Sequence, residues 1–298
     1  MEYGTAIAAA LAAAGSFALA AVLQQEASES VGEDKSLSVG ILLALLRRPK
    51  WLAGGGFMLA GFGLQALALS YGPVALVQPI VVTELAFAIP FAIVRRHRRA
   101  GAREWAGVLC VMSGIALFLL AASPGRGIQE PPGTDWLLSL LPVAVVASSA
   151  VAVGSRTRGP TRAMFLGSAA GLSFGVLSVL TKALTHLLST DVAKAFTTWQ
   201  VYVTVAVGVV ALVVSQSAYQ AGPLAYSMPF VGVLEPFVAV MIGDTVLGEQ
   251  VSTSAGVLAL QAVAAAIASG GILLLSTSGL VLSIYQESHP VRVTHPQA

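Results

Sequence analysis

The sequence predicts an all-α protein that crosses a membrane several times. Of its 298 residues, 56% are hydrophobic and only 10% are charged, and the mean hydropathy is +0.82. A soluble domain has about 25% charged residues, so this chain cannot cover itself with a water-facing surface. Apolar runs of about 20 residues recur along it. In a bilayer such runs form spanning helices, because a helix pairs its own backbone groups.

About nine runs are long enough to cross. In chain order they are Tyr3–Gln24, Trp51–Tyr71, Val74–Val94, Trp105–Ala122, Trp136–Val153, Ala163–Leu184, Trp199–Tyr219, Leu224–Ile242 and Ser254–Leu275. The segment near 37–48 is too short to cross comfortably, so we expect a cytoplasmic interfacial helix there, with a short tenth span as the alternative. Residues 277–298 are predicted to form a disordered cytoplasmic tail.

One sequence pattern occurs twice, 150 positions apart (72 and 222). Gly72–Pro79 reads G-P-V-A-L-V-Q-P and Gly222–Pro229 reads G-P-L-A-Y-S-M-P. Each stretch is followed by apolar residues that contain one acid, Glu84 in the first copy and Glu235 in the second. Two matches in corresponding places indicate a duplicated unit.

Shorter matches extend the duplication. Ser16-Phe17 with Val22-Leu23 is echoed by Ser173-Phe174 with Val179-Leu180, and Trp51 is echoed by Trp199. The sequence therefore predicts two four-helix repeats, 1–122 and 154–276, joined by a linking span within 123–153. Equivalent helices lie five spans apart, an odd number, so the two halves face opposite ways. This inverted repeat is the architecture of many secondary transporters.

The basic residues predict the orientation. Only three of the 16 Lys and Arg residues, Arg126, Lys182 and Lys194, fall on or near the side opposite the others. By the positive-inside rule the N-terminus is then outside and the C-terminus cytoplasmic; ten spans would put the N-terminus inside. We expect a multi-pass protein of the plasma membrane, with the lipid bilayer as a partner and no nucleic acid.

Glu84 and Glu235 are expected near the middle of the bilayer. Each lies ten or eleven residues into its span, or ~15 Å at 1.5 Å per residue. An ionised carboxylate at that depth costs at least a few kcal/mol if it faces lipid, so each must face protein or water, or be protonated. The functional interpretation is a pair of acids that binds a proton or a cation at the pseudo-twofold axis. The alternative is two protonated or hydrogen-bonded structural acids, or one acid that lies at a cytoplasmic or outer mouth.

Four prolines in the same two spans, Pro79, Pro90, Pro229 and Pro236, are predicted to break the helices. Proline lacks the N–H that would bond the carbonyl four residues back. Backbone carbonyls freed in this way would suit a hard cation beside Glu235, and simple kinks are the alternative.

Further polar residues lie on these and neighbouring spans. The candidates for substrate or ion contact are Gln65, Gln78, Thr83, Gln216 and Tyr226. Tyr219 and Gln220 share a helical stripe with Gln216. Interhelical hydrogen bonds are the commoner explanation of such groups. Gly167, Gly171 and Gly175 form a G-x-x-x-G-x-x-x-G run, which predicts close helix packing.

The first Gly-Pro region also resembles a known family. The stretch from Trp51 through Leu120, with its core Leu67–Pro79, resembles the drug/metabolite transporter superfamily, and in particular EamA-like proteins and the NIPA-type magnesium transporters. Members carry a comparable A-(L/F)-x-x-(G/A)-P-x-x-L-V-x-P stretch, and Leu247-Gly248-Glu249 matches their "GE" turn in the second half. Where the first repeat of the family often has an acidic turn, this chain has the basic run 95–99. The resemblance implies the transporter fold and class, and it makes magnesium one alternative cargo.

Nothing in the sequence indicates an enzyme or a cofactor. The single cysteine, Cys110, excludes an intrachain disulfide, and there is no phosphate-binding loop, H-E-x-x-H motif or nucleophile elbow. We expect a secondary transporter that works by alternating access. Its cargo is either a small polar or amphipathic metabolite, coupled to protons through Glu84 or Glu235, or a divalent cation. A non-transporting membrane scaffold is the alternative from another class, and the sequence leaves a homodimer open.

Overall fold

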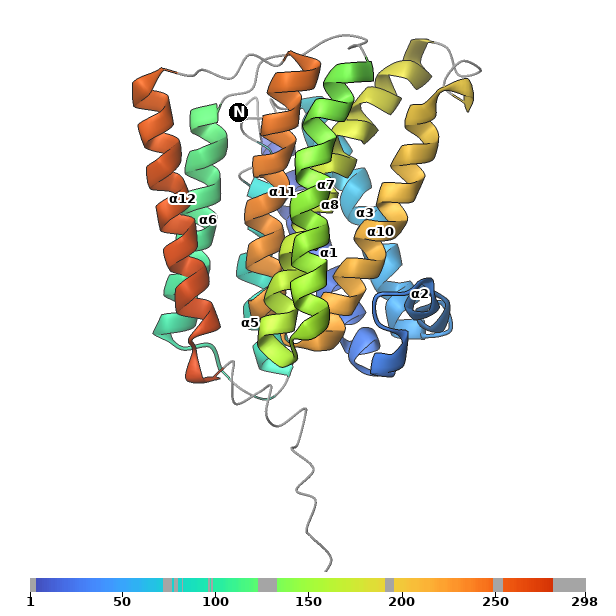
Figure 1. The fold of residues 1–298 in the computed structure, drawn as a ribbon. Coiled ribbons are helices and arrows are strands. Elements are labelled where there is room, and N and C mark those ends of the chain that lie inside the picture. The colour runs from blue at the N-terminus through green and yellow to red at the C-terminus, as the bar shows by residue number, and fades with distance from the viewer. Residues whose placement is uncertain are drawn as a thin grey trace, which may run out of the picture.

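The computed structural model describes residues 4–71, 77, 80–81, 83–95, 97, 99–122, 133–190, 196–248 and 254–280. Within these ranges the chain is helical and has no strand, as the sequence predicts. The long helices lie side by side in one bundle, with α2 at one end of it (Figure 1). The α-helices are α1 (Gly4–Glu29), α2 (Val39–Leu45), α3 (Pro49–Tyr71), α5 (Glu84–Arg95), α6 (Ala102–Ala122), α7 (Gly133–Arg156), α8 (Gly159–Thr190), α10 (Trp199–Ala221), α11 (Leu224–Leu247) and α12 (Ala255–Ser276).

Six of these helices, α1, α7, α8, α10, α11 and α12, are both long and apolar enough to cross a membrane. The prediction of a multi-pass helical membrane protein is therefore confirmed. Helices α3 and α6 have 23 and 21 residues, and at least ~31 Å of helix matches a hydrocarbon core of ~30 Å. The count of nine stays a prediction, because the span expected at Val74–Val94 lies partly outside the described residues.

The segment near 37–48 forms the short helix α2. Its seven residues make only ~10 Å of helix, which is too short to cross a bilayer, so the alternative tenth span does not form. Ile41 and Leu45 are fully buried against Val31 and Val213, while other apolar side chains of α2 are exposed. Packing on one side and exposure on the other fit the predicted interfacial helix.

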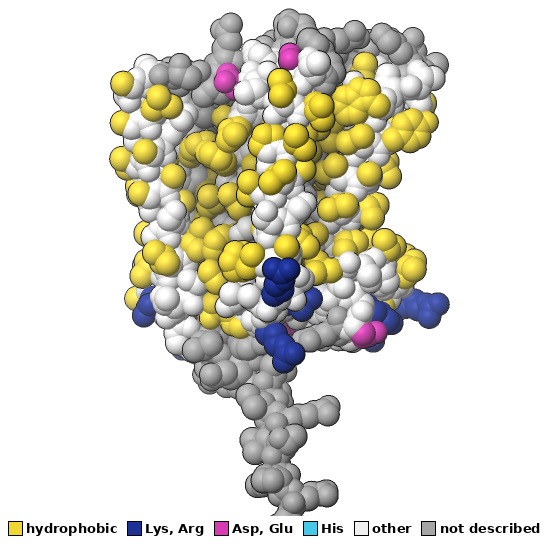
Figure 2. Space-filling view, in the orientation of Figure 1, with side chains coloured by type: hydrophobic (Ala, Val, Ile, Leu, Met, Phe, Trp, Pro, Cys, Tyr) yellow, Lys and Arg dark blue, Asp and Glu magenta, His cyan; other side chains and the backbone are white. Residues whose placement is uncertain are grey.

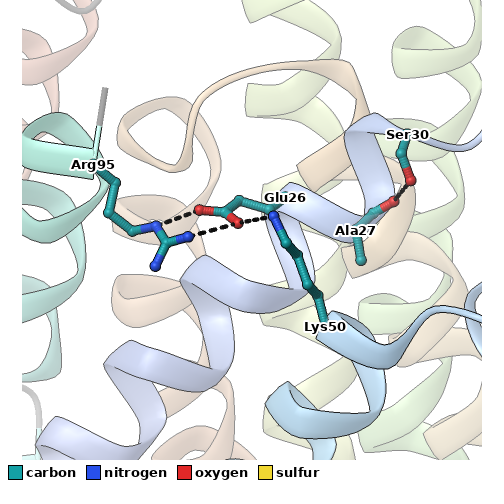
Figure 3. A network of polar contacts seen from close by, with 5 residues as sticks. All are labelled: Glu26, Ala27, Ser30, Lys50 and Arg95. Carbon is teal, nitrogen blue, oxygen red and sulfur yellow. Dashed lines mark hydrogen bonds and ion pairs between the residues drawn. The ribbon is translucent and has the colours of Figure 1, made fainter. Parts of the chain in front are cut away.

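Basic side chains gather at one end of the bundle, which we call the basic end (Figure 2). There Glu26, near the end of α1, forms ion pairs with two basic side chains at once (Figure 3). Its Oε2 accepts from Lys50 Nζ at 2.9 Å, and its Oε1 lies 2.5 Å from Arg95 Nε. Since Lys50 belongs to α3 and Arg95 to α5, one carboxylate joins the ends of three helices.

The prediction that prolines break the helices is wrong at three of the four positions. Helix α5 continues through Pro90, and α11 continues through Pro229 and Pro236. Packing from neighbouring helices lets a membrane helix tolerate one missing backbone hydrogen bond. The span predicted at Val74–Val94 is interrupted at Thr83, which forms a turn immediately before α5 begins. Pro79 lies outside the described residues.

The glycine run of α8 packs directly on the backbone of α11, as predicted from sequence. A Cβ atom placed on Gly167 would lie 2.8 Å from Ser227 Cα, and one on Gly171 would lie 2.9 Å from Val231 Cα. On Gly175 it would lie 2.7 Å from the carbonyl oxygen of Glu235. The contacts advance together along both helices, so α8 and α11 run parallel.

Helices α6 and α12 make a second close contact, and this one is antiparallel. A Cβ on Gly107 would lie 3.2 Å from the carbonyl oxygen of Gly271, and one on Gly114 would lie 2.7 Å from that of Ala264. The ends are also tied. Arg103 donates to Thr277 Oγ1 at 2.6 Å, and Ser278 donates to Glu104. The chain is thus still packed at Ser278, so the predicted tail begins later than residue 277.

We expect Gly171→Ala to lower the free energy of unfolding by about 1–3 kcal/mol, because the added methyl overlaps the backbone of α11. Gly55→Ala in α3 is the matched control, since a Cβ there meets nothing within 4 Å. It should raise the free energy of unfolding by about 0.5–1 kcal/mol, the usual gain of Ala over Gly inside a helix. Denaturation of both variants in detergent measures the difference. Equal stability of the two variants would contradict the close contact.

Candidate functional site

The two predicted acids lie at the same depth in the bundle. Glu84 opens α5, eleven residues before Arg95 (95 − 84), and Glu235 lies eleven residues after Leu224 (235 − 224). Arg95 and Leu224 lie at the same level of the bundle. Glu26 of α1 pairs with Arg95, and the next residue of α1 toward its start, Gln25, donates to the carbonyl of Gly222, two residues before Leu224, at 3.1 Å. Each acid is therefore ~16 Å from the basic end, near the middle of a ~30 Å core.

The acids are also close to one another. Glu84 and Glu235 are near enough for their carboxylates to repel each other when both are ionised. Gly232, one turn before Glu235, faces the side chain of Leu85, which follows Glu84. One acid from each half of the chain thus lies at mid-depth, and Tyr219 of α10 packs beside Leu85 from the basic end.

Several features hold these groups in place. Glu84 lies in the first turn of α5, where the helix dipole favours a carboxylate. Ser178 of α8 donates to Glu235 Oε1 at 3.4 Å. Gly175, one turn earlier on α8, fixes the backbone of Glu235. Ser178 was not expected from sequence. Its signal was its position, one helical turn beyond the glycine run.

The surroundings of the acids are mostly apolar. Tyr219, which is 9% exposed, shares a buried cluster with Val22, Leu85 and Ile89. Both acids are themselves only partly buried, and the side chain of Ser178 is exposed. The carboxyl groups therefore lie beside a packed apolar cluster, and the serine that donates to Glu235 is exposed.

Gln216 does not lie with the acids. It is fully buried, and its polar atoms bond to other helices. Its Oε1 accepts from Ser28 Oγ at 2.8 Å and from Trp51 Nε1 at 3.1 Å, and its Nε2 donates to Gln24 Oε1 at 2.9 Å. These contacts use three of the four hydrogen bonds that an amide side chain can make, and all three go to other helices, so the structure assigns Gln216 an interhelical role. We call Gln24, Ser28, Trp51 and Gln216 the glutamine network.

Gln220 extends these contacts at the basic end. Its amide donates to the carbonyls of Val31 and Gly32 at 2.7 and 3.0 Å. The sequence had placed Gln216, Tyr219 and Gln220 on one stripe, but the structure separates them by function. Tyr219 packs in the apolar cluster beside Leu85, and the two glutamines join α10 to α1 and to the loop that follows it. Gln24 and Ser28 were not predicted, because polar residues at the end of an apolar run are ordinary helix-end residues.

The other predicted site residues are scattered. Thr83 donates to the carbonyl of Ile80 at 2.6 Å and shapes the turn before Glu84. Tyr226 is buried in the first turn of α11, and Gln65 is partly buried in α3. Gln78 lies outside the described residues. Their roles in binding stay predictions.

Within the ranges that the structure describes, no three His, Cys, Asp or Glu side chains lie close enough together to hold a metal ion. A cation held here would therefore use the two carboxylates together with neutral oxygens. Ser178 supplies a hydroxyl. Pro236 supplies no N–H, so the carbonyl of Gly232 has no such donor four residues ahead. Carboxylate, hydroxyl and carbonyl oxygens are the ligands that hard cations prefer.

Comparison with known proteins gives one relationship. The chain is 30% identical over 244 residues to the "Uncharacterized protein Cgl0250/cg0304" of Corynebacterium glutamicum. The match covers 81% of this chain and 84% of the other. The two belong to one family. No protein-family profile matches the chain, and no solved structure does. The relationship extends over most of the chain, so it concerns the whole bundle.

The proximity of the acids predicts that they are energetically coupled. Replacing Glu84 or Glu235 by Gln removes one partner of a charge interaction, so the effect of the second substitution should depend on the first. We expect the double variant to differ from the sum of the single variants by at least about 0.5 kcal/mol in the free energy of unfolding.

Denaturation in detergent at pH 7 measures this coupling. The control cycle pairs Glu84→Gln with Glu104→Gln, because Glu104 is held at the basic end by Gly101 N–H at 2.7 Å and by Ser278. That cycle should be additive. Additivity in both cycles would show that the two mid-depth acids do not interact.

Proposed function

We propose that this protein is a secondary transporter that works by alternating access, with Glu84 and Glu235 as its proton or cation site. The observation that carries the proposal is that one acid from each half of the chain lies at the same mid-bundle depth, with Gly232, one turn before Glu235, packed against Leu85, which follows Glu84. Ionisable groups inside the membrane are costly, and they usually mark the path of an ion or a substrate.

The proposed architecture is an inverted repeat, and the contact between α6 and α12 supports it. Gly114 meets Ala264, and these two residues are 150 positions apart (264 − 114), the same separation as between Gly72 and Gly222. In an inverted repeat, equivalent residues touch only where the pseudo-twofold axis passes. An antiparallel pair of equivalent helices that crosses at equivalent residues is the arrangement that such an axis produces.

The chemistry of the site favours an exchangeable positive charge. Two neighbouring carboxylates in an apolar setting repel each other, and each is costly when ionised. A proton or a cation that binds between them removes both costs. Release of that ion restores them, so binding and release can drive a change of conformation. We propose that the basic end faces the cytoplasm, following the positive-inside rule.

Two cargoes fit this site. The first is a small polar or amphipathic solute whose movement is coupled to protons on the acids. The second is magnesium, as in the NIPA-type transporters that the sequence resembles, and the available oxygen ligands support it. Magnesium keeps several waters and needs only one or two carboxylates, so the absence of a larger acidic cluster among the described residues is compatible with it.

Reconstitution into proteoliposomes that contain a magnesium-sensitive dye separates these cargoes. If magnesium is transported, the wild-type protein gives an influx above that of empty liposomes. Glu84→Gln and Glu235→Gln should each reduce the influx at least tenfold, because each removes a charged ligand. Glu104→Gln, which alters an acid at the basic end, should keep it.

If magnesium does not move, a thermal-shift screen of organic cations and small metabolites comes next. A transported solute should stabilise the wild-type protein more than either acid variant, because it binds the folded site. A protein that shows neither magnesium flux nor acid-dependent stabilisation by any solute would be a membrane scaffold, and the transporter proposal would be wrong.

A further inference from the structure

The glutamine network closes the basic end of the bundle. It joins α1, α3 and α10 through four side chains, of which Gln216 and Ser28 are fully buried and Gln24 is 2% exposed. Buried hydrogen bonds of this kind are costly to break unless new partners are found. Next to the network, Glu26 ties α1 to α3 and α5 (Figure 3). The helices are thus held together between the acids and the basic end.

The opposite side of the acids carries exposed polar side chains. Ser178 lies one turn beyond Gly175, which marks the level of Glu235, and α8 runs from the basic end toward the far end. Ser178 and Thr181 are exposed and share one face of α8. The other faces of α8 pack against α7, α10 and α11. The exposed polar face therefore leads away from Glu235 toward the far end.

The duplication relates these two regions residue by residue. Ser16 corresponds to Ser173, a separation of 157 (173 − 16), and the same separation takes Gln24 to Thr181 and Ser28 to Thr185. Trp51 corresponds to Trp199. Gln65 precedes the first Gly-Pro by seven positions and Gln216 precedes the second by six, so they match to within one position. Every member of the glutamine network thus has a hydrogen-bonding residue at or next to the corresponding position in the other half.

We propose that the glutamine network is the closed gate of the transporter at the basic end, and that Gln65, Thr181 and Trp199 form the matching gate at the far end, which is the open one in this structure. The inference rests on the proposed alternating access. When the far gate closes around its own polar residues, the glutamine network opens, and Glu84 and Glu235 become accessible from the basic end.

Two probe positions related by the duplication test the proposal. Ser178 and Ala21 correspond at the same separation of 157 (178 − 21). Ser178 is exposed, whereas Ala21 is 7% exposed and packs in the apolar cluster with Tyr219 on the basic side of the acids. Cys110→Ala removes the native thiol, so Ser178→Cys or Ala21→Cys becomes the only cysteine. In lipid nanodiscs, a charged thiol reagent should modify Ser178→Cys quickly and Ala21→Cys slowly.

Gln216→Leu should reverse this pattern. It leaves the polar atoms of Ser28, Trp51 and Gln24 without their shared partner, so it destabilises the state in which the basic end is closed. We expect the labelling of Ala21→Cys to rise and that of Ser178→Cys to fall, each about tenfold, which is the effect of losing one buried hydrogen-bonding group. Gln261→Leu on α12, an amide outside the network, is the matched control and should change neither rate.

The outcomes separate a gate from a packing contact. Faster labelling of Ala21→Cys with no change at Ser178→Cys would mean local loosening, and it would overturn the proposal, as would unchanged rates in a folded protein. If Gln216→Leu does not fold, Ser28→Ala and Trp51→Phe each remove one hydrogen bond and take its place. The readout is independent of cargo. Opposite changes in the labelling of Ala21→Cys and Ser178→Cys, without any transport or binding that depends on the acids, would support the gate proposal and contradict the proposed ion site.

Discussion

A bilayer supplies no hydrogen-bond partners, and this constraint decides where the polar side chains of the chain lie. In the glutamine network, Gln216 makes short bonds to three residues, and each of these would be costly to leave unpaired. At the acids, Ser178 makes only a long contact of 3.4 Å with Glu235. Strong bonds hold the helices together near the basic end, while weaker ones surround the carboxylates. Partial satisfaction of this kind is compatible with the proposed role of the acids, because an ion bound there could be released.

The position of Glu235 depends on packing without side chains. Three glycines of α8 touch the backbone of α11 in register, and the last of them contacts Glu235 itself. A larger residue at any of the three would push α11 away and move the acid from its partners. The glycine face therefore acts on the site through geometry rather than through chemistry. Because α8 also carries Ser178, one helix sets both the backbone position of Glu235 and the hydroxyl that reaches it.

Features that depend on local pattern could be predicted from the sequence, and those that depend on distant partners could not. Apolar runs gave the membrane helices, and the spacing of Gly167, Gly171 and Gly175 gave the packing face. Gln216 was a candidate for substrate contact, with interhelical hydrogen bonding as the commoner explanation, and nothing local shows that its partner is Gln24, 192 positions away (216 − 24). The prolines were expected to break helices because the missing N–H is visible in the sequence, whereas the packing that compensates for it is not. The turn at Thr83 had no comparable sequence signal.

The contact between Gly114 and Ala264 limits how the proposed motion can occur. If the pseudo-twofold axis passes through this contact, the α6–α12 pair maps onto itself when the two halves exchange conformations, so it need not change. Its backbones touch through glycine, which makes it a stiff reference for the remaining helices. The acids lie near the same mid-depth and would also move little. The glutamine network and its counterpart at the far end are further from the axis, so a small rotation of one half against the other separates one set of residues while it brings the other set together. The largest displacement then falls on the residues that hydrogen-bond across helices, and the bound ion stays at mid-depth.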